Sequence, residues 1–338
     1  MRIQRVLSAA NVLARNGEVT SPLASYRYRT SIPLRELKSR GHDCKWFALQ
    51  KGVEPESATL LDADILIFGK NHIEQDLVLA CLDSARANGV PTVVDICDDY
   101  FETGAKLESY YRALVHKADL VTTSSAQLAF YIEEATGEQP RVIVDCYEGP
   151  RGAPRWRPDR RHVKGLWFGS PGNMQSLIGE AEQLPNRISG YKLDLTVLTS
   201  DMPGIEAAFR RFNERCGSKI SLRYRQWSLE NNWAALGSCD LVVIPVDRNE
   251  RFYLAKGANR LVEALWAGRF AVVNSIPAYD EFSSLAWVGA SIADGISWAL
   301  AHPADVQERI AAAQTYIDCT HSPAKIASEW EQALLGAI

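Results

Sequence analysis

Apolar runs and amphipathic stretches alternate along the first half of the chain. The apolar runs predict strands at 4–9, 44–49, 64–69, 92–97, 120–125 and 141–146. Between them, apolar residues recur with helical spacing at roughly 25–40, 74–88, 106–117 and 125–136. Strands and helices that alternate in this way predict an α/β domain with a parallel, doubly wound sheet.

The second half repeats the alternation with different residues. Its apolar runs predict strands at 165–169, 193–199, 220–225, 240–246 and 270–274. Its helices are expected at about 204–215, 230–237, 258–267 and 279–285. After residue 291 the pattern is helical only, and the amphipathic stretch 325–335 predicts a helix that crosses back onto the first domain.

A change of composition separates the two halves. Residues 148–164 hold three prolines and five arginines and show no core pattern, which is typical of a linker. We therefore expect a Rossmann-like N-terminal domain at 1–150, a linker at 151–163, a Rossmann-like C-terminal domain at 164–320 and a final helix at 321–338. Two such domains leave a cleft between them, and ligands of such sheets bind beyond the carboxyl ends of the strands.

The composition of the chain excludes several classes of function. The 338 residues are 46% hydrophobic and 23% charged, and the formal net charge of -4 does not favour nucleic acid as a partner. No apolar run approaches the ~20 residues of a membrane span, and Arg5 and Arg15 interrupt any signal-peptide core. Seven scattered cysteines and six histidines show no metal-binding spacing. These features predict a cytoplasmic protein with free thiols, in which peripheral membrane contact by the arginine-rich linker is an alternative.

Residues 256–268, KGANRLVEALWAG, have two faces if they form a helix. The apolar face has helical spacing and consists of Ala258, Leu261, Val262 and Leu265. The opposite face is polar and consists of Lys256, Asn259, Arg260 and Glu263. Gly268 is suited to end the helix because glycine adopts the left-handed conformation at little cost. A solvated outer face is one explanation of the four polar residues.

A bound diphosphate is the other explanation. The N-terminus of a helix favours an anion, and Lys256 and Arg260 would supply cationic donors beside it. At helical i,i+4 spacing these like charges repel each other unless an anion lies between them. Glu263, one turn further, can accept hydrogen bonds from two ribose hydroxyls.

This segment resembles the donor-binding segment of GT-B glycosyltransferases, especially those similar to the retaining family four (glycosyl transferases group 1). The pattern K-x-x-N-R-x-x-E-A-x-x-A-G carries the resemblance in Lys256, Asn259, Arg260, Glu263, Ala264, Ala267 and Gly268. Residues 25–43, 118–132 and 141–150 resemble parts of the family's first domain. Many members have a second glutamate eight positions before the ribose-binding one, where this chain has Ala255.

The resemblance implies a GT-B architecture, in which two Rossmann-like domains face a cleft. It implies a nucleotide-diphosphate sugar as the donor, a glycan or small molecule as the acceptor, and neither a metal nor another cofactor. Lys256, Asn259, Arg260 and Glu263 would bind the nucleotide part of the donor. A sugar-nucleotide epimerase or hydrolase on the same fold is one alternative, and a non-catalytic nucleotide-sugar-binding protein is another.

Two further loops that follow predicted strands are candidates for donor contact. The first loop can offer backbone amides to a phosphate or a sugar, and its candidates are Gly169, Ser170, Gly172 and Asn173. The second loop holds Trp227, in a region that borders the nucleobase in the resembled family. An ordinary turn and a buried tryptophan are the alternatives.

Three aspartates crowd the end of the predicted strand 92–97, namely Asp95, Asp98 and Asp99. Carboxylates this close resist joint ionisation unless they are solvated, paired or used. We expect Asp98 and Asp99 to bind the acceptor, with one aspartate accepting the proton of its hydroxyl. His72, which follows another strand, is a second candidate for an acceptor-side base. A helix cap, a Mg²⁺ site and an incidental histidine are the alternatives. The predicted catalytic residues are therefore Asp98, Asp99, His72, Lys256 and Arg260.

Overall fold

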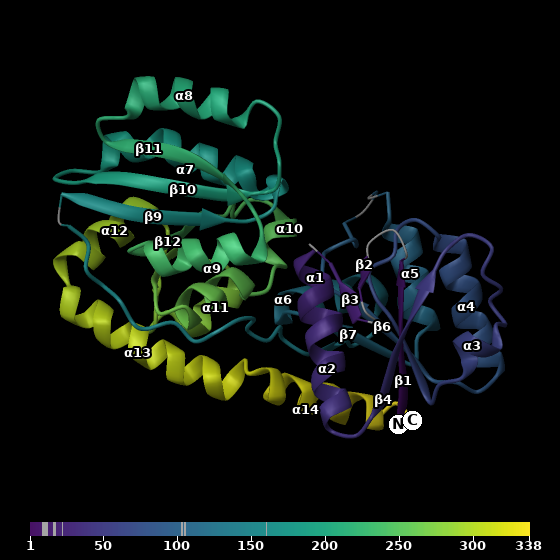
Figure 1. Ribbon diagram of the computed structural model, residues 1–338. Helices are drawn as coiled ribbons and strands as arrows, with labels where there is room; N and C mark the ends of the chain where they lie inside the picture. Colours follow the sequence, from purple (N-terminus) through teal and green to yellow (C-terminus); the bar gives the residue numbers. More distant parts are fainter. Residues whose placement is uncertain (9–12, 16–17, 22, 103, 105, 160) are drawn as a thin grey trace. The chain divides into compact units, whose positions relative to one another are not determined.

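The chain divides into two compact units, each with its own sheet. The computed structural model describes residues 1–8, 13–15, 18–21, 23–102, 104, 106–159 and 161–338 (Figure 1). The first unit consists of Met1–Cys146, Leu254–Gly257 and Thr320–Ile338, and the second of Tyr147–Tyr253 and Ala258–Cys319. Each unit holds a six-stranded parallel sheet with flanking helices, which confirms the predicted pair of doubly wound α/β sheets.

The sheet of the first unit has the strand order β4-β1-β5-β6-β7-β8. Its strands are β1 (Arg2–Ser8), β4 (Asp43–Leu49), β5 (Ile65–Phe68), β6 (Thr92–Ile96), β7 (Leu120–Thr123) and β8 (Arg141–Val142). All residues of β5 and β6 are buried, as expected for parallel strands that are covered on both faces. The order reverses between β1 and β5, and such a reversal is where ligands bind in these sheets.

The helices of the first unit lie where the sequence predicts them, and the unit also contains one short helix and one β-hairpin that were not predicted. They are α1 (Ala24–Tyr26), the π-helix η2 (Arg27–Ser31), α2 (Ile32–Ser39), α3 (Ala58–Leu61), α4 (Gln75–Ala87), α5 (Glu108–Lys117), α6 (Ala126–Thr136) and α14 (Pro323–Leu335). The additions are α3 and a hairpin of β2 (Leu13–Arg15) and β3 (Glu18–Thr20). Both are short, so that neither leaves a clear periodic signal in the sequence.

The C-terminal helix α14 packs against α2 within the first unit (Figure 1). Trp330 is fully buried, and its ring lies under the guanidinium groups of Arg5 and Arg29 at 5.5 and 5.1 Å. At the rim, Arg40 donates a hydrogen bond to Glu331 over 2.9 Å. The helix therefore closes the apolar core on one side of the first sheet.

The sheet of the second unit has the strand order β11-β10-β9-β12-β13-β14. Its strands are β9 (His162–Phe168), β10 (Lys192–Thr199), β11 (Ile220–Gln226), β12 (Leu241–Ile244), β13 (Phe270–Asn274) and β14 (Trp287–Gly289). The order reverses between β9 and β12, so that the loops after these two strands meet at the ligand-binding edge. The three-residue edge strand β14 is too short for the sequence pattern to reveal.

The helices of the second unit are η3 (Pro171–Asn173), α7 (Met174–Arg187), α8 (Ile205–Cys216), α9 (Leu229–Ser238), α11 (Asn259–Trp266), η4 (Pro277–Phe282), α12 (Ile292–Ala301) and α13 (Pro303–Thr320). A further short helix, α10 (Arg251–Leu254), ends at the boundary between the units. Helix α7 was not predicted, because Gly179 and Pro185 weaken its helix signal in the sequence. The helix expected at 279–285 is the 3₁₀ helix η4 instead.

The arginine-rich segment packs against the second unit. Trp156 lies in its apolar core, with its ring centroid 6.1 Å from that of Phe270. Tyr147 stacks on Trp266 at 3.9 Å, and the amide of Gly152 donates to the carbonyl of Trp266 over 3.0 Å. The expectation that no core pattern survives here is therefore wrong, because two aromatic residues anchor a segment that otherwise reads as polar.

Candidate functional site

The loop after β9 lies at the switch point of the second sheet. Gly169 leaves the strand, and the 3₁₀ helix η3 then leads directly into α7. A Cβ atom on Gly169 would lie 3.2 Å from the ring of Trp167 and 3.4 Å from Nη1 of Arg260. A larger residue would therefore crowd Arg260. The structure brings the predicted loop Gly169–Asn173 next to the predicted cation Arg260.

Helix α11 supplies Arg260 from its first turn. Among the residues that the structure describes, Nη1 of Arg260 is buried and has no hydrogen-bond partner. Burial raises the pKa of Tyr279, and the charge of Arg260 and a hydrogen bond between the two side chains partly oppose this rise. A buried guanidinium donor without an acceptor is unfavourable, and an anionic ligand at this position would satisfy it. Asn259 is the first residue of the same helix, and Gly268 follows its end with a φ of 71°.

Glu263, one turn after Arg260, is only 4% exposed. Its Oε2 accepts a hydrogen bond from Nδ2 of Asn232 over 3.2 Å. The solvated outer face considered for this helix is therefore wrong for Glu263, because its side chain is buried and hydrogen-bonded to Asn232 of α9. Asn232 was not predicted, although a signal exists: it shares the buried stripe of α9 with Ala235 and Leu236. A polar residue on an apolar helix face usually has a specific partner.

One more predicted donor contact, Trp227, lies in the second unit. Trp227 follows β11, is half-buried, and its amide donates to the carbonyl of Thr199 over 2.7 Å. The hydroxyl of Tyr253, in α10, donates to the carbonyl of Gly172 over 2.9 Å. The segment between β12 and α11 therefore contains a helical turn that contacts the loop after β9.

Lys256 lies three residues before α11 and belongs to the first unit, whereas Arg260 belongs to the second. The expected i,i+4 pair of Lys256 and Arg260 on one helix is therefore wrong. The ammonium of Lys256 forms an ion pair with Oδ1 of Asp98. Its neighbour Ala255, at the position where many family members have a glutamate, is buried, and its carbonyl accepts from the hydroxyl of Ser125 over 2.6 Å.

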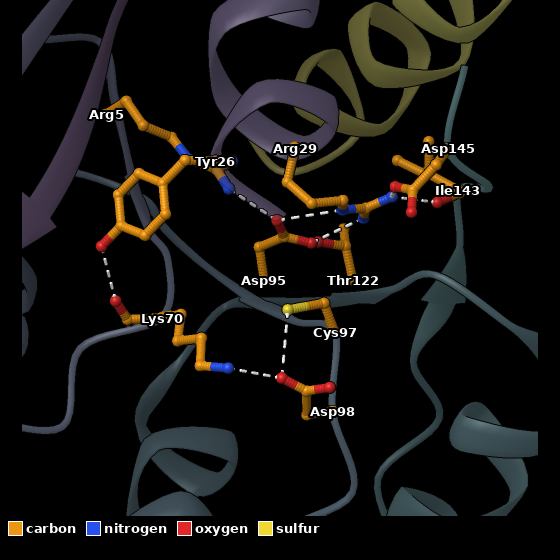
Figure 2. Close-up of polar contacts among 10 residues, drawn as sticks. All are labelled: Arg5, Tyr26, Arg29, Lys70, Asp95, Cys97, Asp98, Thr122, Ile143 and Asp145. Atoms are coloured by element: carbon orange, nitrogen blue, oxygen red, sulfur yellow. Dashed lines mark hydrogen bonds and ion pairs between the residues drawn. The ribbon is translucent and has the colours of Figure 1, made fainter. Parts of the chain in front are cut away.

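Asp98 contacts four polar side chains of the first unit, namely those of Lys70, Lys256, Tyr100 and Cys97. Its Oδ2 accepts from Nζ of Lys70 over 2.6 Å (Figure 2) and from the hydroxyl of Tyr100 over 3.1 Å. Burial alone would raise the pKa of Asp98, but the ammonium groups of Lys256 and Lys70 outweigh it and lower this pKa to about 2. Lys70 was not predicted, although it stands between the strand β5 and the candidate His72.

The stability of the first unit should depend on the ionisation of Asp98. Because the folded pKa of about 2 lies below the ordinary value of 3.8, the stabilisation is present above that value and is lost as the pH falls toward 2. The full contribution is about 2 kcal/mol, of which roughly half should be lost between pH 6 and pH 3. Carboxyl ¹³C titration should find a resonance with a pKa near 2 that disappears in Asp98→Asn. A resonance assigned to Asp98 that titrates near 4 would contradict this ion-pair arrangement.

The other two acceptor-side candidates, Asp99 and His72, each contact a neighbouring group of the first unit. Oδ1 of Asp99 accepts from the amide of Phe101 over 3.0 Å, as in a turn. Nε2 of His72 and the hydroxyl of Tyr111 are 2.9 Å apart, and the rings of Tyr100 and Tyr111 meet the imidazole edge-on. Burial and the charge of Lys70 lower the pKa of His72. The imidazole is therefore neutral at pH 7 and able to accept a proton.

Asp95 belongs to a buried network that holds the sheet together. Its carboxylate pairs with Arg5 and Arg29 at 2.6 Å each and accepts from Thr122 over 2.9 Å (Figure 2). Arg29 also pairs with Asp145 at 3.1 Å. The pKa of Asp95 is lowered, because the two guanidinium charges outweigh the effect of burial. The three crowded aspartates thus separate into a structural residue, Asp95, and two residues near the end of the strand.

Two negative findings apply to the described part of the chain. No three His, Cys, Asp or Glu side chains come together there in a way that could hold a metal ion. None of its helices combines the length and the apolar character that a membrane span requires.

No protein-family model matches the chain, and no curated protein sequence matches it. Solved structures do match it. HepE of Anabaena, solved with UDP, is 13% identical with a TM-score of 0.70 over 99% of this chain and 100% of its own. A glycosyltransferase from Rickettsia africae is 11% identical with a TM-score of 0.70 over 99% and 98%.

A glycine-to-arginine mutant of S. aureus TarM, solved with fondaparinux, α-GlcNAc-glycerol and UDP, is 15% identical with a TM-score of 0.58. That match covers 80% of this chain and 55% of TarM, so the chain spans about half the length of TarM. At these identities the likeness concerns the fold. The chain has the two-domain GT-B fold of these glycosyltransferases.

Proposed function

We propose that the chain is a glycosyltransferase that moves a sugar from a nucleotide-diphosphate sugar to an acceptor hydroxyl. The observation that carries this proposal is the buried Nη1 of Arg260, which has no partner among the described residues and lies next to Gly169 at the switch point of the second sheet. A diphosphate has the charge and the acceptor oxygens that this position lacks.

The donor would bind to residues of the second unit. Arg260, the first-turn amides of α11 and the loop Gly169–Asn173 would hold the diphosphate. Glu263 would accept hydrogen bonds from the ribose hydroxyls, and Asn232 would orient its carboxylate. Trp227 would contact the nucleobase. HepE and TarM were both solved with UDP, which favours uridine as the nucleoside.

Catalysis would consist mainly of stabilising the leaving group. Negative charge grows on the diphosphate as the glycosidic bond breaks, and donors already aimed at that charge lower the barrier. Arg260 and the α11 amides would supply these donors without a metal ion or another cofactor. The predicted contribution of Lys256 to the same charge remains part of the proposal, alongside its observed pair with Asp98.

The acceptor would bind at the polar end of the first sheet. Neutral His72 is suited to take the proton of the acceptor hydroxyl, because its lowered pKa leaves the imidazole unprotonated at pH 7. Asp98, with a pKa of about 2, is too weak a base for this step and would instead position Lys70 and Lys256. Asp99 would contribute acceptor hydrogen bonds. The cytoplasm is the location that we expect from the sequence.

Thermal unfolding with a panel of nucleotides tests this function. UDP at about 100 times its Kd should stabilise the protein by about 3 kcal/mol, which corresponds to a rise in Tm of roughly 5–10 °C. Incubation with UDP-glucose and other UDP-sugars, with and without a panel of acceptors, should give a glycosylated product only when an acceptor is present.

The other outcomes distinguish the alternatives. Release of free sugar without acceptor would identify a hydrolase, and conversion of the donor sugar would identify an epimerase. Stabilisation by UDP without turnover of any donor would point to a binding protein. If no nucleoside diphosphate raises the Tm, the proposed donor site is wrong.

A further inference from the structure

Lys70 stands at the ligand-binding edge of the first sheet. It comes two residues after β5, next to the reversal of strand order between β1 and β5. Asp98 comes two residues after β6, the neighbouring strand, so that parallel pairing brings the two side chains together (Figure 2). The hydroxyl of Tyr26 donates to the carbonyl of Lys70 over 2.9 Å and fixes the backbone at this point.

The ammonium of Lys70 shares its counter-ion, Asp98, with Lys256. Oδ1 of Asp98 is taken by Lys256, and Oδ2 serves both Lys70 and the hydroxyl of Tyr100. Among the described residues, the bond to Oδ2 is the one hydrogen bond of an ammonium that has three donors. The Lys70 side chain is 30% exposed, so it is in part open to solvent.

The other groups around Lys70 do not supply a second anion. The neighbours that interact electrostatically with it are Asp98, the thiol of Cys97 and the hydroxyl of Tyr26. Burial and Asp98 raise the pKa of Cys97 to about 12, so its thiol is neutral at pH 7. His72 is neutral as well, because burial and Lys70 lower its pKa. Among these groups, Asp98 is the carboxylate that balances Lys70.

An aromatic wall borders the same position. Tyr100 stacks on Tyr111 with the ring centroids 4.0 Å apart, and Nζ of Lys70 lies 5.9 Å from the centre of the Tyr100 ring. His72 meets both rings edge-on. Tyr111 is buried, whereas Tyr100 is half-buried, so that a ligand with an acidic group for Lys70 could place an apolar face against Tyr100.

We propose that Lys70 binds an acidic group of the acceptor, so that the chain selects acceptors that carry a phosphate or a carboxylate. This inference rests on the proposed glycosyl transfer and names its acceptor class. An anion would accept hydrogen bonds from the remaining N–H donors of Lys70. It would also supply a second negative charge, since Asp98 alone faces the ammonium groups of two lysines. A neutral acceptor would displace water from the ammonium without replacing that charge.

Binding of simple probes, with saturating UDP present to fill the donor site, tests the inference. The wild type should bind glucose 6-phosphate or glucuronate at least tenfold more tightly than glucose, as measured by ligand-observed NMR. The comparison of these two probes shows whether phosphate or carboxylate is preferred. Lys70→Gln should reduce the preference to less than threefold. Lys117→Gln, which removes an exposed Lys–Asp pair of the same unit, should keep it.

The preference should also fall in the wild type as KCl is raised from 50 to 500 mM, because added salt screens an accessible ion pair. This salt dependence tests the inference if Lys70→Gln does not fold. Equal binding of glucose and both acidic probes by the wild type, or an unchanged preference in folded Lys70→Gln, would overturn the inference. Failure of UDP to bind would instead count against the proposed function, since the acidic preference can be measured without UDP.

Discussion

Replacement of Arg260 by glutamine should lower kcat/KM for the nucleotide-sugar donor about 100-fold, as expected for the loss of a charged donor to the leaving group. The Tm should change little, because Nη1 of Arg260 is buried and has no hydrogen-bond partner among the described residues. Steady-state kinetics of UDP release, together with thermal unfolding, would measure both effects.

The matched control is Arg211→Gln on the exposed face of α8 in the same unit, which should keep full activity.

The sequence predicts that Lys256→Ala also impairs transfer, by at least about tenfold if Lys256 supports the leaving group. Full activity of both Arg260→Gln and Lys256→Ala would mean that the donor binds elsewhere.

Asp95→Asn should destabilise the first unit by about 3–5 kcal/mol, the usual cost of removing one partner from a buried ion pair. Arg5 and Arg29 would keep their charges in a site where Asp95 is 4% exposed, and Arg29 alone would retain Asp145. Urea unfolding followed by circular dichroism would measure the change.

Asp83→Asn is the control for this substitution, because Asp83 pairs with Lys117 at the surface and its side chain is 57% exposed. It should leave the unfolding midpoint nearly unchanged. If Asp95→Asn lost no more stability than Asp83→Asn, the network of Figure 2 would not be holding the sheet together.

Some residues could be assigned to their place from local pattern. Helix α11 and its end at Gly268 follow from apolar spacing and from the conformational freedom of glycine, and both are observed. The loop Gly169–Asn173 was expected at the end of a buried strand, where it is found. Pattern also identified Arg260 as the cation of the first helical turn, although its diphosphate role remains a prediction.

Other assignments failed because they depend on contacts between distant segments. Lys256 was placed on a helix with Arg260 because the two are four residues apart, yet it pairs with Asp98, which is 158 positions away in the sequence. Three neighbouring aspartates looked equivalent in the sequence. Strand order separates them, because it brings Arg5 of β1 and Arg29 of η2 to Asp95 and leaves Asp98 to the lysines.

By itself, the sequence determined the alternation of strands and helices, the two-sheet α/β fold, and the loops that carry polar residues. These features follow from hydrophobic periodicity and turn chemistry, which act over a few neighbouring residues. The tertiary structure alone decided that Glu263 is buried against Asn232 and that Lys70 shares Asp98 with Lys256. Charge pairing and burial depend on which strands and helices become neighbours, and no local pattern contains that information.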